Sequence, residues 1–80
     1  MFYVYIIKST TKNWYYVGIS KNLERRLISH NSGLNRSTKP YKPFRLKFAQ
    51  MVSNGKSARN LEKFLKVRFN KEALLDLLED

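Results

Sequence analysis

The pattern of hydrophobic and polar positions marks three strand-forming stretches that are separated by polar turns. Residues 2–7 are all aromatic or β-branched, and residues 14–17 form a second run of this kind beyond a polar turn. Together they predict an antiparallel hairpin that ends at Gly18, a residue suited to free backbone or to the close approach of another group. Residues 44–48 alternate between apolar and basic, which predicts a third strand with one exposed, positively charged face.

Apolar positions three and four residues apart predict helices between and after these strands. A first helix, capped by Ser20 or Asn22, is expected to run to about His30 and to end near Gly33, since glycine suits a left-handed cap. A second helix is expected from about residue 57 to residue 69.

These elements predict a single domain over residues 1–80. Its core lies at about residues 2–69, and a short leucine-rich helix follows at about residues 71–78. The element order is then ββαβαα, an α+β fold in which a three-stranded antiparallel sheet is flanked by helices. The last helix either covers the domain's own core or docks on a larger assembly. We favour the first arrangement, and a monomer.

The composition excludes several classes of protein. The chain has no cysteine, so neither disulfides nor thiolate metal sites are available to it. No apolar run approaches the roughly 20 residues of a membrane span, and nothing resembles a signal peptide. We therefore expect a cytoplasmic protein with no membrane partner.

The charge is distributed unevenly along the chain. All 16 Lys and Arg residues lie within residues 1–71, where only Glu24 and Glu62 oppose them, so sixteen cations less two acids leave +14. The four remaining acids make residues 72–80 negative. A body this basic attracts polyphosphates by releasing counterions, which predicts nucleic acid as partner, although a merely soluble basic surface is the alternative. The side chains expected to hold a nucleic-acid backbone are Arg36, Lys39, Lys42, Arg45 and Lys47.

Two tyrosines are candidates for chemistry in the hairpin. Period-two geometry places Tyr5 on one face of the first strand and Tyr16 on one face of the second, and the hairpin can bring them to the same side. The alternative is that both are ordinary packing residues of a sheet.

The first helix carries a second pair of candidates. Arg26 and His30 are four residues apart, so they lie on one helical face at the edge of its apolar stripe, whereas Arg25 is expected to point into solvent. An arginine near tyrosines is well placed to bind a phosphate through two hydrogen bonds. The alternatives are that Arg26 covers apolar surface with its stem and that His30 interacts with the helix dipole.

Glu62 is the candidate metal ligand. It lies on the apolar side of its predicted helix, where a carboxylate is costly unless it is paired or bound to a cation. The alternative is an ion pair with Lys66 or with Arg59 on the same helix. A site with one carboxylate would leave the ion most of its waters and suits a single Mg²⁺, or Mn²⁺.

Taken together, these residues carry a resemblance to a known family. Tyr3-Val4-Tyr5, then Tyr16-Val17-Gly18, then Asn22-Leu23 with Arg26 and His30, and finally Glu62 resemble the GIY-YIG nuclease superfamily. The closest match is to small single-domain bacterial members related to the amino-terminal domain of excision-repair endonucleases. The resemblance implies that Tyr5, Tyr16, Arg26 and His30 are catalytic and that Glu62 binds the metal.

The resemblance also implies an activity, which is metal-dependent hydrolysis of DNA phosphodiester bonds, in repair or recombination. Three departures are visible: Tyr3 stands where the family name has Gly, Ile19 follows Gly18 where some repair enzymes have lysine, and an assisting asparagine has only Asn70 as counterpart. These departures, and the missing second domain, favour a rival interpretation. In that interpretation the protein is a non-catalytic nucleic-acid-binding module that retains the nuclease fold.

Overall fold

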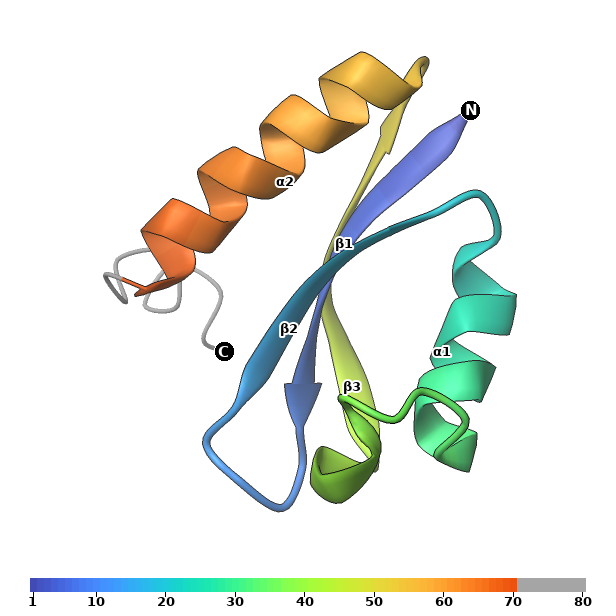
Figure 1. The fold of residues 1–80 in the computed structure, drawn as a ribbon, viewed down its shortest axis with the longest axis vertical. Helices are drawn as coiled ribbons and strands as arrows, with labels where there is room; N and C mark the ends of the chain where they lie inside the picture. Colours follow the sequence, from blue (N-terminus) through green and yellow to red (C-terminus); the bar gives the residue numbers. More distant parts are fainter. Residues whose placement is uncertain (71–80) are drawn as a thin grey trace.

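The molecule is built on a three-stranded antiparallel sheet with a helix on each face (Figure 1). The computed structural model describes residues 1–70, with side chains as far as Val67. Its elements are β1 (Phe2–Ser9), β2 (Tyr15–Ser20), α1 (Leu23–Ser32), the short 3₁₀ helix η1 (Lys39–Tyr41), β3 (Phe44–Val52) and α2 (Gly55–Asn70). The predicted α+β class and the order ββαβα over these residues are confirmed. The helix predicted over residues 71–78 lies outside the described residues.

Strand β1 is the central strand, with β2 on one side and β3 on the other. Its register places Tyr5 opposite Gly18 of β2 and opposite Ala49 of β3. The side chains of Val4, Ile6 and their neighbours on β1 are buried because helices cover both faces of this strand.

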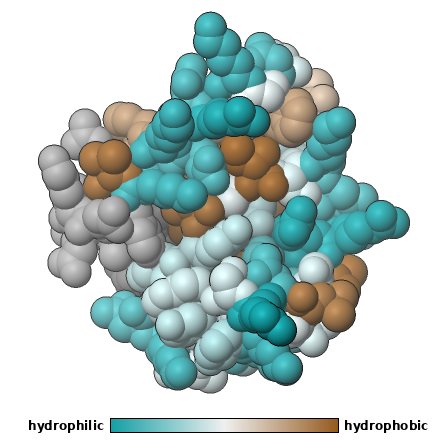
Figure 2. Space-filling view, in the orientation of Figure 1, coloured by the Kyte–Doolittle hydropathy of each residue, from teal (hydrophilic) through white to brown (hydrophobic). Residues whose placement is uncertain are grey.

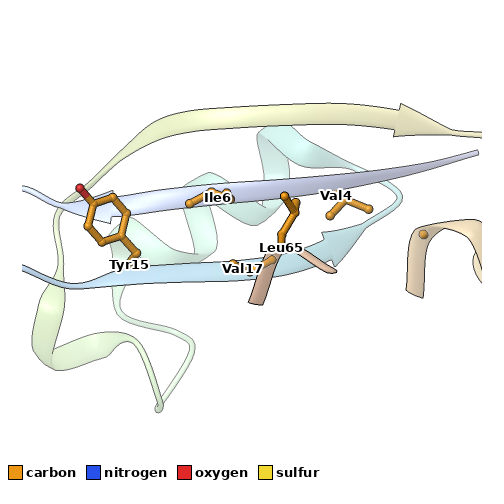
Figure 3. Packing of buried hydrophobic residues seen from close by; sticks show 6 residues of the cluster. Val4, Ile6, Tyr15, Val17 and Leu65 are labelled. Carbon is orange, nitrogen blue, oxygen red and sulfur yellow. The ribbon is translucent and has the colours of Figure 1, made fainter. Parts of the chain in front are cut away.

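Alternate residues of β1 face different helices. Val4 and Ile6 pack with Val17 of β2 against Ala58 and Leu65 of α2 (Figure 3). The residues between them point the other way, toward a second cluster that includes Leu23 and Leu27 of α1. The period of two predicted from the sequence therefore assigns each residue of β1 to one of two separate cores.

Both predicted ends of helix α1 are confirmed. Asn22, rather than Ser20, is the N-cap, and its side-chain oxygen accepts a hydrogen bond from the backbone N–H of Arg25 at 3.0 Å. Ser20 supports this turn by donating its hydroxyl to the carbonyl of Asn22. Gly33 ends the helix at φ 80°, in the left-handed region, and its N–H donates to the carbonyl of His30.

All three strands are longer than the sequence pattern predicts, and β1 continues past residue 7 to Ser9. Strand β2 does not end at Gly18 but continues to Ser20, because its pairing with β1 extends to Tyr3. Strand β3 continues beyond residue 48 to Val52 for the same reason, since β1 offers partners along its whole length. The local pattern misses these residues because pairing across the sheet, not their own side chains, makes them extended.

The surface of the molecule shows hydrophobic side chains in separate patches among hydrophilic ones in the view of Figure 2. Large exposed hydrophobic residues include Ile28 and Leu34 near α1 and Phe64 and Val67 on α2. Within residues 1–70, no helix is both long and apolar enough to cross a membrane.

Candidate functional site

The site begins at the point where β1 and β2 place Tyr5 opposite Gly18. A Cβ atom at position 18 would lie 2.5 Å from the hydroxyl oxygen of Tyr5 and 2.8 Å from the ring of Tyr16, closer than real contacts allow. The absence of a side chain on Gly18 therefore makes room for both tyrosines. Their ring centroids lie 6.3 Å apart on the face of the sheet that α1 covers, so the predicted same-side placement of the pair is present.

Helix α1 adds His30, which is fully buried between the sheet and the loop that follows the helix. Its Nε2 lies 2.9 Å from the Tyr5 hydroxyl, and its Nδ1 lies 2.9 Å from the hydroxyl of Thr38, which is also fully buried. The Thr38 hydroxyl donates its proton to the carbonyl of Asn35, so it accepts from His30. His30 thus carries its proton on Nδ1, and Tyr5 donates to Nε2.

The electrostatics agree with this assignment of protons. Burial lowers the pKa of His30, and the positive charge of Arg26 lowers it further, so the imidazole is neutral near pH 7. Burial raises the pKa of the Tyr5 hydroxyl, chiefly by desolvation, and the hydroxyl remains protonated. Tyr5, His30 and Thr38 form an uncharged hydrogen-bonded chain with each polar atom satisfied.

Tyr16 is the more accessible of the two tyrosines. It is half-buried, whereas Tyr5 is 1% exposed. The ring centroid of Tyr16 lies 5.1 Å from that of His30, so the aromatic rings of Tyr5, Tyr16 and His30 form one cluster. Tyr16 is therefore the phenol of this cluster that solvent or a substrate can reach.

Arg26 lies at the exposed margin of this cluster. It lines a pocket of about 250 Å³ together with Arg25, Ser20, Asn22 and Ser29. Its charge reaches the cluster, since it lowers the pKa of both His30 and Tyr5. Arg25 is exposed, as predicted, but it also lines the pocket of Arg26, because long arginine side chains reach around the helix surface.

Glu62 approaches from α2, which covers the opposite face of the sheet. Its side chain is 21% exposed, and its carboxylate forms an ion pair with Lys66 at 3.2 Å, one of the two pairs considered as alternatives to metal binding. The charge of Glu62 also raises the pKa of Tyr5, although burial, Tyr16 and Arg26 each have a larger effect on that pKa. Glu62 is therefore within electrostatic reach of the tyrosine cluster as well as paired on its own helix.

The candidate metal ligand near this cluster is the carboxylate of Glu62, because both nitrogens of His30 are already hydrogen-bonded. Within residues 1–70 no three His, Asp or Glu side chains come together in a way that could hold a metal ion. One half-buried carboxylate is a fitting ligand for a hard cation that keeps most of its water, such as Mg²⁺ or Mn²⁺.

The five predicted backbone-binding residues do not all gather at this site. Arg36, Lys39, Lys42 and Arg45 are exposed, and Lys47 is half-buried. Arg45 lines a different pocket, formed with residues 8–13 at the end of the hairpin. The basic surface therefore extends beyond the tyrosine cluster along β3.

Two residues at the candidate site were not among the predicted site residues. Thr38 holds the imidazole from a loop eight residues away, and no periodic pattern marks it. Arg25 was set apart from Arg26 by the helical period alone. A buried histidine always needs partners for both nitrogens, and this requirement was the one available signal for Thr38.

Comparison with known proteins identifies the family. The model of the GIY-YIG catalytic domain matches residues 1–74. The chain belongs to the GIY-YIG family. This membership confirms the resemblance drawn from the spaced tyrosine motifs and the arginine helix, and it agrees with the three-stranded sheet of the structure.

Two relatives show which GIY-YIG proteins this chain resembles. The UPF0213 protein SH2523 of Staphylococcus haemolyticus is 33% identical over 79 residues, which cover 98% of this chain and 94% of that protein. The solution NMR structure of the UPF0213 protein BH0048 from Bacillus halodurans superimposes with a TM-score of 0.55 at 31% identity, covering 96% of this chain and 85% of that one. The chain is thus similar over nearly its whole length to bacterial UPF0213 proteins.

Proposed function

We propose that this protein is a metal-dependent endonuclease that hydrolyses phosphodiester bonds of DNA. The observation that supports the proposal most directly is the cluster at Gly18. There an accessible tyrosine, a buried tyrosine–histidine pair and an exposed arginine meet in a chain of the GIY-YIG family. The basic surface around them would attract the polyanionic substrate.

Arg26 would bind the scissile phosphate. Its guanidinium offers a planar set of donors that matches two phosphoryl oxygens, and its fixed charge would stabilise the charge that develops on them. Arg25, in the same pocket, would hold a neighbouring phosphate of the strand.

Tyr16 would position the attacking water, and in its phenolate form, which the cationic surroundings would stabilise, it would accept that water's proton. Tyr5 is poorly suited to this role because it is buried, because its pKa is raised, and because its proton is already donated to His30. Tyr5 and His30 would instead fix the ring of Tyr16 and stabilise its hydroxyl through the cluster. His30 accepts a hydrogen bond from Tyr5 and donates one to Thr38, so it holds the Tyr5 hydroxyl in a single orientation beside Tyr16.

Glu62 would hold the metal ion from α2, at a distance from which its charge still acts on Tyr5. When bound, a hydrated Mg²⁺ or Mn²⁺ supplies charge stabilisation to a phosphodiester and its leaving oxygen. Glu62 would exchange its contact with Lys66 for the ion. Lys66 is 53% exposed and is free to move into solvent when this happens.

The test is cleavage of single-stranded, duplex, flap and junction DNA in the presence of Mg²⁺ or Mn²⁺. Removing one donor from developing charge costs about 10²–10³ in rate, so Arg26→Ala and Glu62→Gln are each expected to lower cleavage by about that factor. Matched controls are Arg59→Ala and Glu24→Gln, which remove the same charges from exposed positions on α2 and α1. Equal rates for Glu62→Gln and Glu24→Gln would contradict the proposed role of Glu62.

The second candidate function is a nucleic-acid-binding module without catalysis. The ion pair between Glu62 and Lys66 favours it, because this pair already satisfies the one acid near the site. A binding module would show salt-sensitive affinity and no metal-dependent cleavage of any substrate in the panel.

A further inference from the structure

The hairpin between β1 and β2 forms a pocket of its own at the end of the sheet. Residues 8–13 and Arg45 of β3 line this pocket, which has a volume of about 460 Å³. None of these residues belongs to the tyrosine cluster. In Figure 2 the lower part of the molecule, over this hairpin, is a surface of intermediate hydropathy with hydrophilic side chains at its margin.

The pocket has the charge of an anion site. Lys8, Lys12 and Arg45 bring three positive charges to its wall. Within residues 1–70 the acids are Glu24 on α1 and Glu62 on α2, and neither lines the pocket. The hydroxyl of Thr10 donates to Pro43, and the hydroxyls of Ser9 and Thr11 bond to each other, so the basic side chains are the groups that would contact an anion.

Hydrogen bonds fix the turn before any ligand binds. The hydroxyl oxygen of Ser9, which is 2% exposed, accepts from the backbone N–H groups of Thr11 at 3.2 Å and of Lys12 at 3.0 Å. Thr10 is tied to the start of β3, because its N–H and its hydroxyl both donate to the carbonyl of Pro43, at 2.9 and 3.1 Å. The wall of the pocket is thus preorganised, which lowers the entropy cost of binding.

Aromatic rings contact Lys8 and Lys12 and connect the pocket to the tyrosine cluster. The Nζ atom of Lys8 lies 5.7 Å from the ring centroid of Tyr15, and that of Lys12 lies 5.1 Å from the ring centroid of Tyr41. Tyr41 stacks on Trp14 at 3.8 Å with an angle of 8°. Trp14 in turn stacks on Tyr16 at 6.3 Å. A continuous column of rings therefore runs from the hairpin to the accessible tyrosine.

We infer that the hairpin pocket is a second phosphate subsite, which binds the backbone of the same nucleic acid a few nucleotides from the bond that is cleaved. The identity of the ligand as nucleic acid rests on the proposed function. Lys8 lies on β1 opposite Tyr15, the neighbour of Tyr16 on β2, so the pocket and the tyrosine cluster lie near each other along the hairpin. A strand bound at the tyrosine cluster would therefore reach the pocket within a few nucleotides, at about 3.4 Å per nucleotide.

The test is the salt dependence of binding, measured by fluorescence anisotropy with a labelled 20-nucleotide single strand in EDTA. Each phosphate contact to a single strand contributes about 0.7 to the slope of log affinity against log salt. Because the two lysines share one phosphate, the double variant Lys8→Gln/Lys12→Gln is expected to lower this slope by about 0.7. The matched control is Lys56→Gln/Lys63→Gln, which removes the same charge from exposed positions of α2. Equal slopes for the two double variants would overturn the subsite.

Two further arms identify the ligand and separate this inference from the proposed function. A dinucleotide is too short to reach both sites, so its affinity is expected to be the same for the hairpin variant and the control. Amide resonances of residues 9–13 that shift with inorganic phosphate but not with the 20-mer would also overturn the subsite. Because the binding assay in EDTA does not require cleavage, loss of the endonuclease proposal through Glu62→Gln leaves this result standing, and the reverse holds as well.

Discussion

At the scale of single residues, the candidate site depends on a side chain that is missing. Gly18 lets the Tyr5 hydroxyl pass close to the backbone of β2, where it meets His30, and it leaves room for the Tyr16 ring beside it. The buried chain from Tyr5 through His30 to Thr38 is uncharged and satisfied. Each member therefore holds the next in a single orientation, which is the condition for precise catalytic geometry.

Replacing Gly18 with alanine is expected to displace both tyrosine rings. The added Cβ would lie 2.5 Å from the Tyr5 hydroxyl oxygen, so the cluster must shift. A displacement of about 1 Å at a catalytic group costs about 10²-fold in rate, and overpacking a core costs about 1–3 kcal/mol of stability. Cleavage assays and urea unfolding measure the two effects. The control is Gly55→Ala, whose Cβ would make ordinary contacts 3.6 Å from Phe2. A Gly18→Ala protein as active as this control would show that the tyrosine cluster does not require glycine at position 18.

His30 makes the stability of the fold sensitive to pH. Its pKa in the folded state is lowered from 6.5, so below pH 6.5 the unfolded chain binds a proton that the folded chain does not. Stability is therefore complete above pH 6.5 and falls as the pH drops from there toward the folded-state pKa, by at most about 1.4 kcal/mol per pH unit. Urea unfolding between pH 5 and pH 8 measures this slope. His30 is the chain's one histidine, so the slope between pH 5.5 and 6.5 should disappear in His30→Gln.

At the scale of elements, helix α1 and strand β1 hold the site in place. The helix is fixed at both ends by local caps, and its stripe of Leu23 and Leu27 packs on the sheet beside Tyr5. The central position of β1 buries its side chains on both faces, which gives Tyr5 a rigid support. The same strand leads to Lys8 and the hairpin pocket, so one element connects the two proposed contacts with nucleic acid.

Loss of the cap at Asn22 is expected to loosen helix α1, which carries Arg25 and Arg26. Asn22→Ala removes the acceptor for the N–H of Arg25 and should destabilise the protein by about 1 kcal/mol, measured as a lower midpoint in urea. Because Asn22 also lines the pocket of Arg25 and Arg26, cleavage should fall more than stability alone explains. Asn22→Ser keeps a capping oxygen and should restore the stability. If Asn22→Ser were as unstable as Asn22→Ala, the cap would not be the cause.

At the scale of the whole molecule, charge dominates how the protein meets other molecules. A net charge of +10 on 80 residues produces a positive potential that attracts polyanions, whatever their nucleotide sequence. The pocket lined by Arg25 and Arg26 and the hairpin pocket lined by Lys8, Lys12 and Arg45 each bring positive charges together, on separate elements.

Binding to duplex DNA should therefore depend on salt and hardly on sequence. Two phosphate contacts alone reduce affinity by about tenfold between 50 and 200 mM salt, and a larger footprint reduces it further. Duplexes of unrelated sequence and equal length should differ by less than about threefold, because contacts to phosphates carry no sequence information. Anisotropy titrations at both salt concentrations provide the measurement. A strong preference for one duplex sequence would show that contacts to bases, and not only to phosphates, contribute to the affinity.

The amino-acid sequence by itself determined where the strands and helices of residues 1–70 form, and which face most of them present. The period of two in β1, the cap residues Asn22 and Gly33 and the uneven charge are local properties, so they could be read directly. The tertiary structure alone decided the lengths of the strands, the contact of Tyr5 with Gly18, the partnership of His30 with Thr38 and the effect of the Glu62 charge on Tyr5. These features depend on which distant segments pair across the sheet and pack on it, and no local pattern records that information.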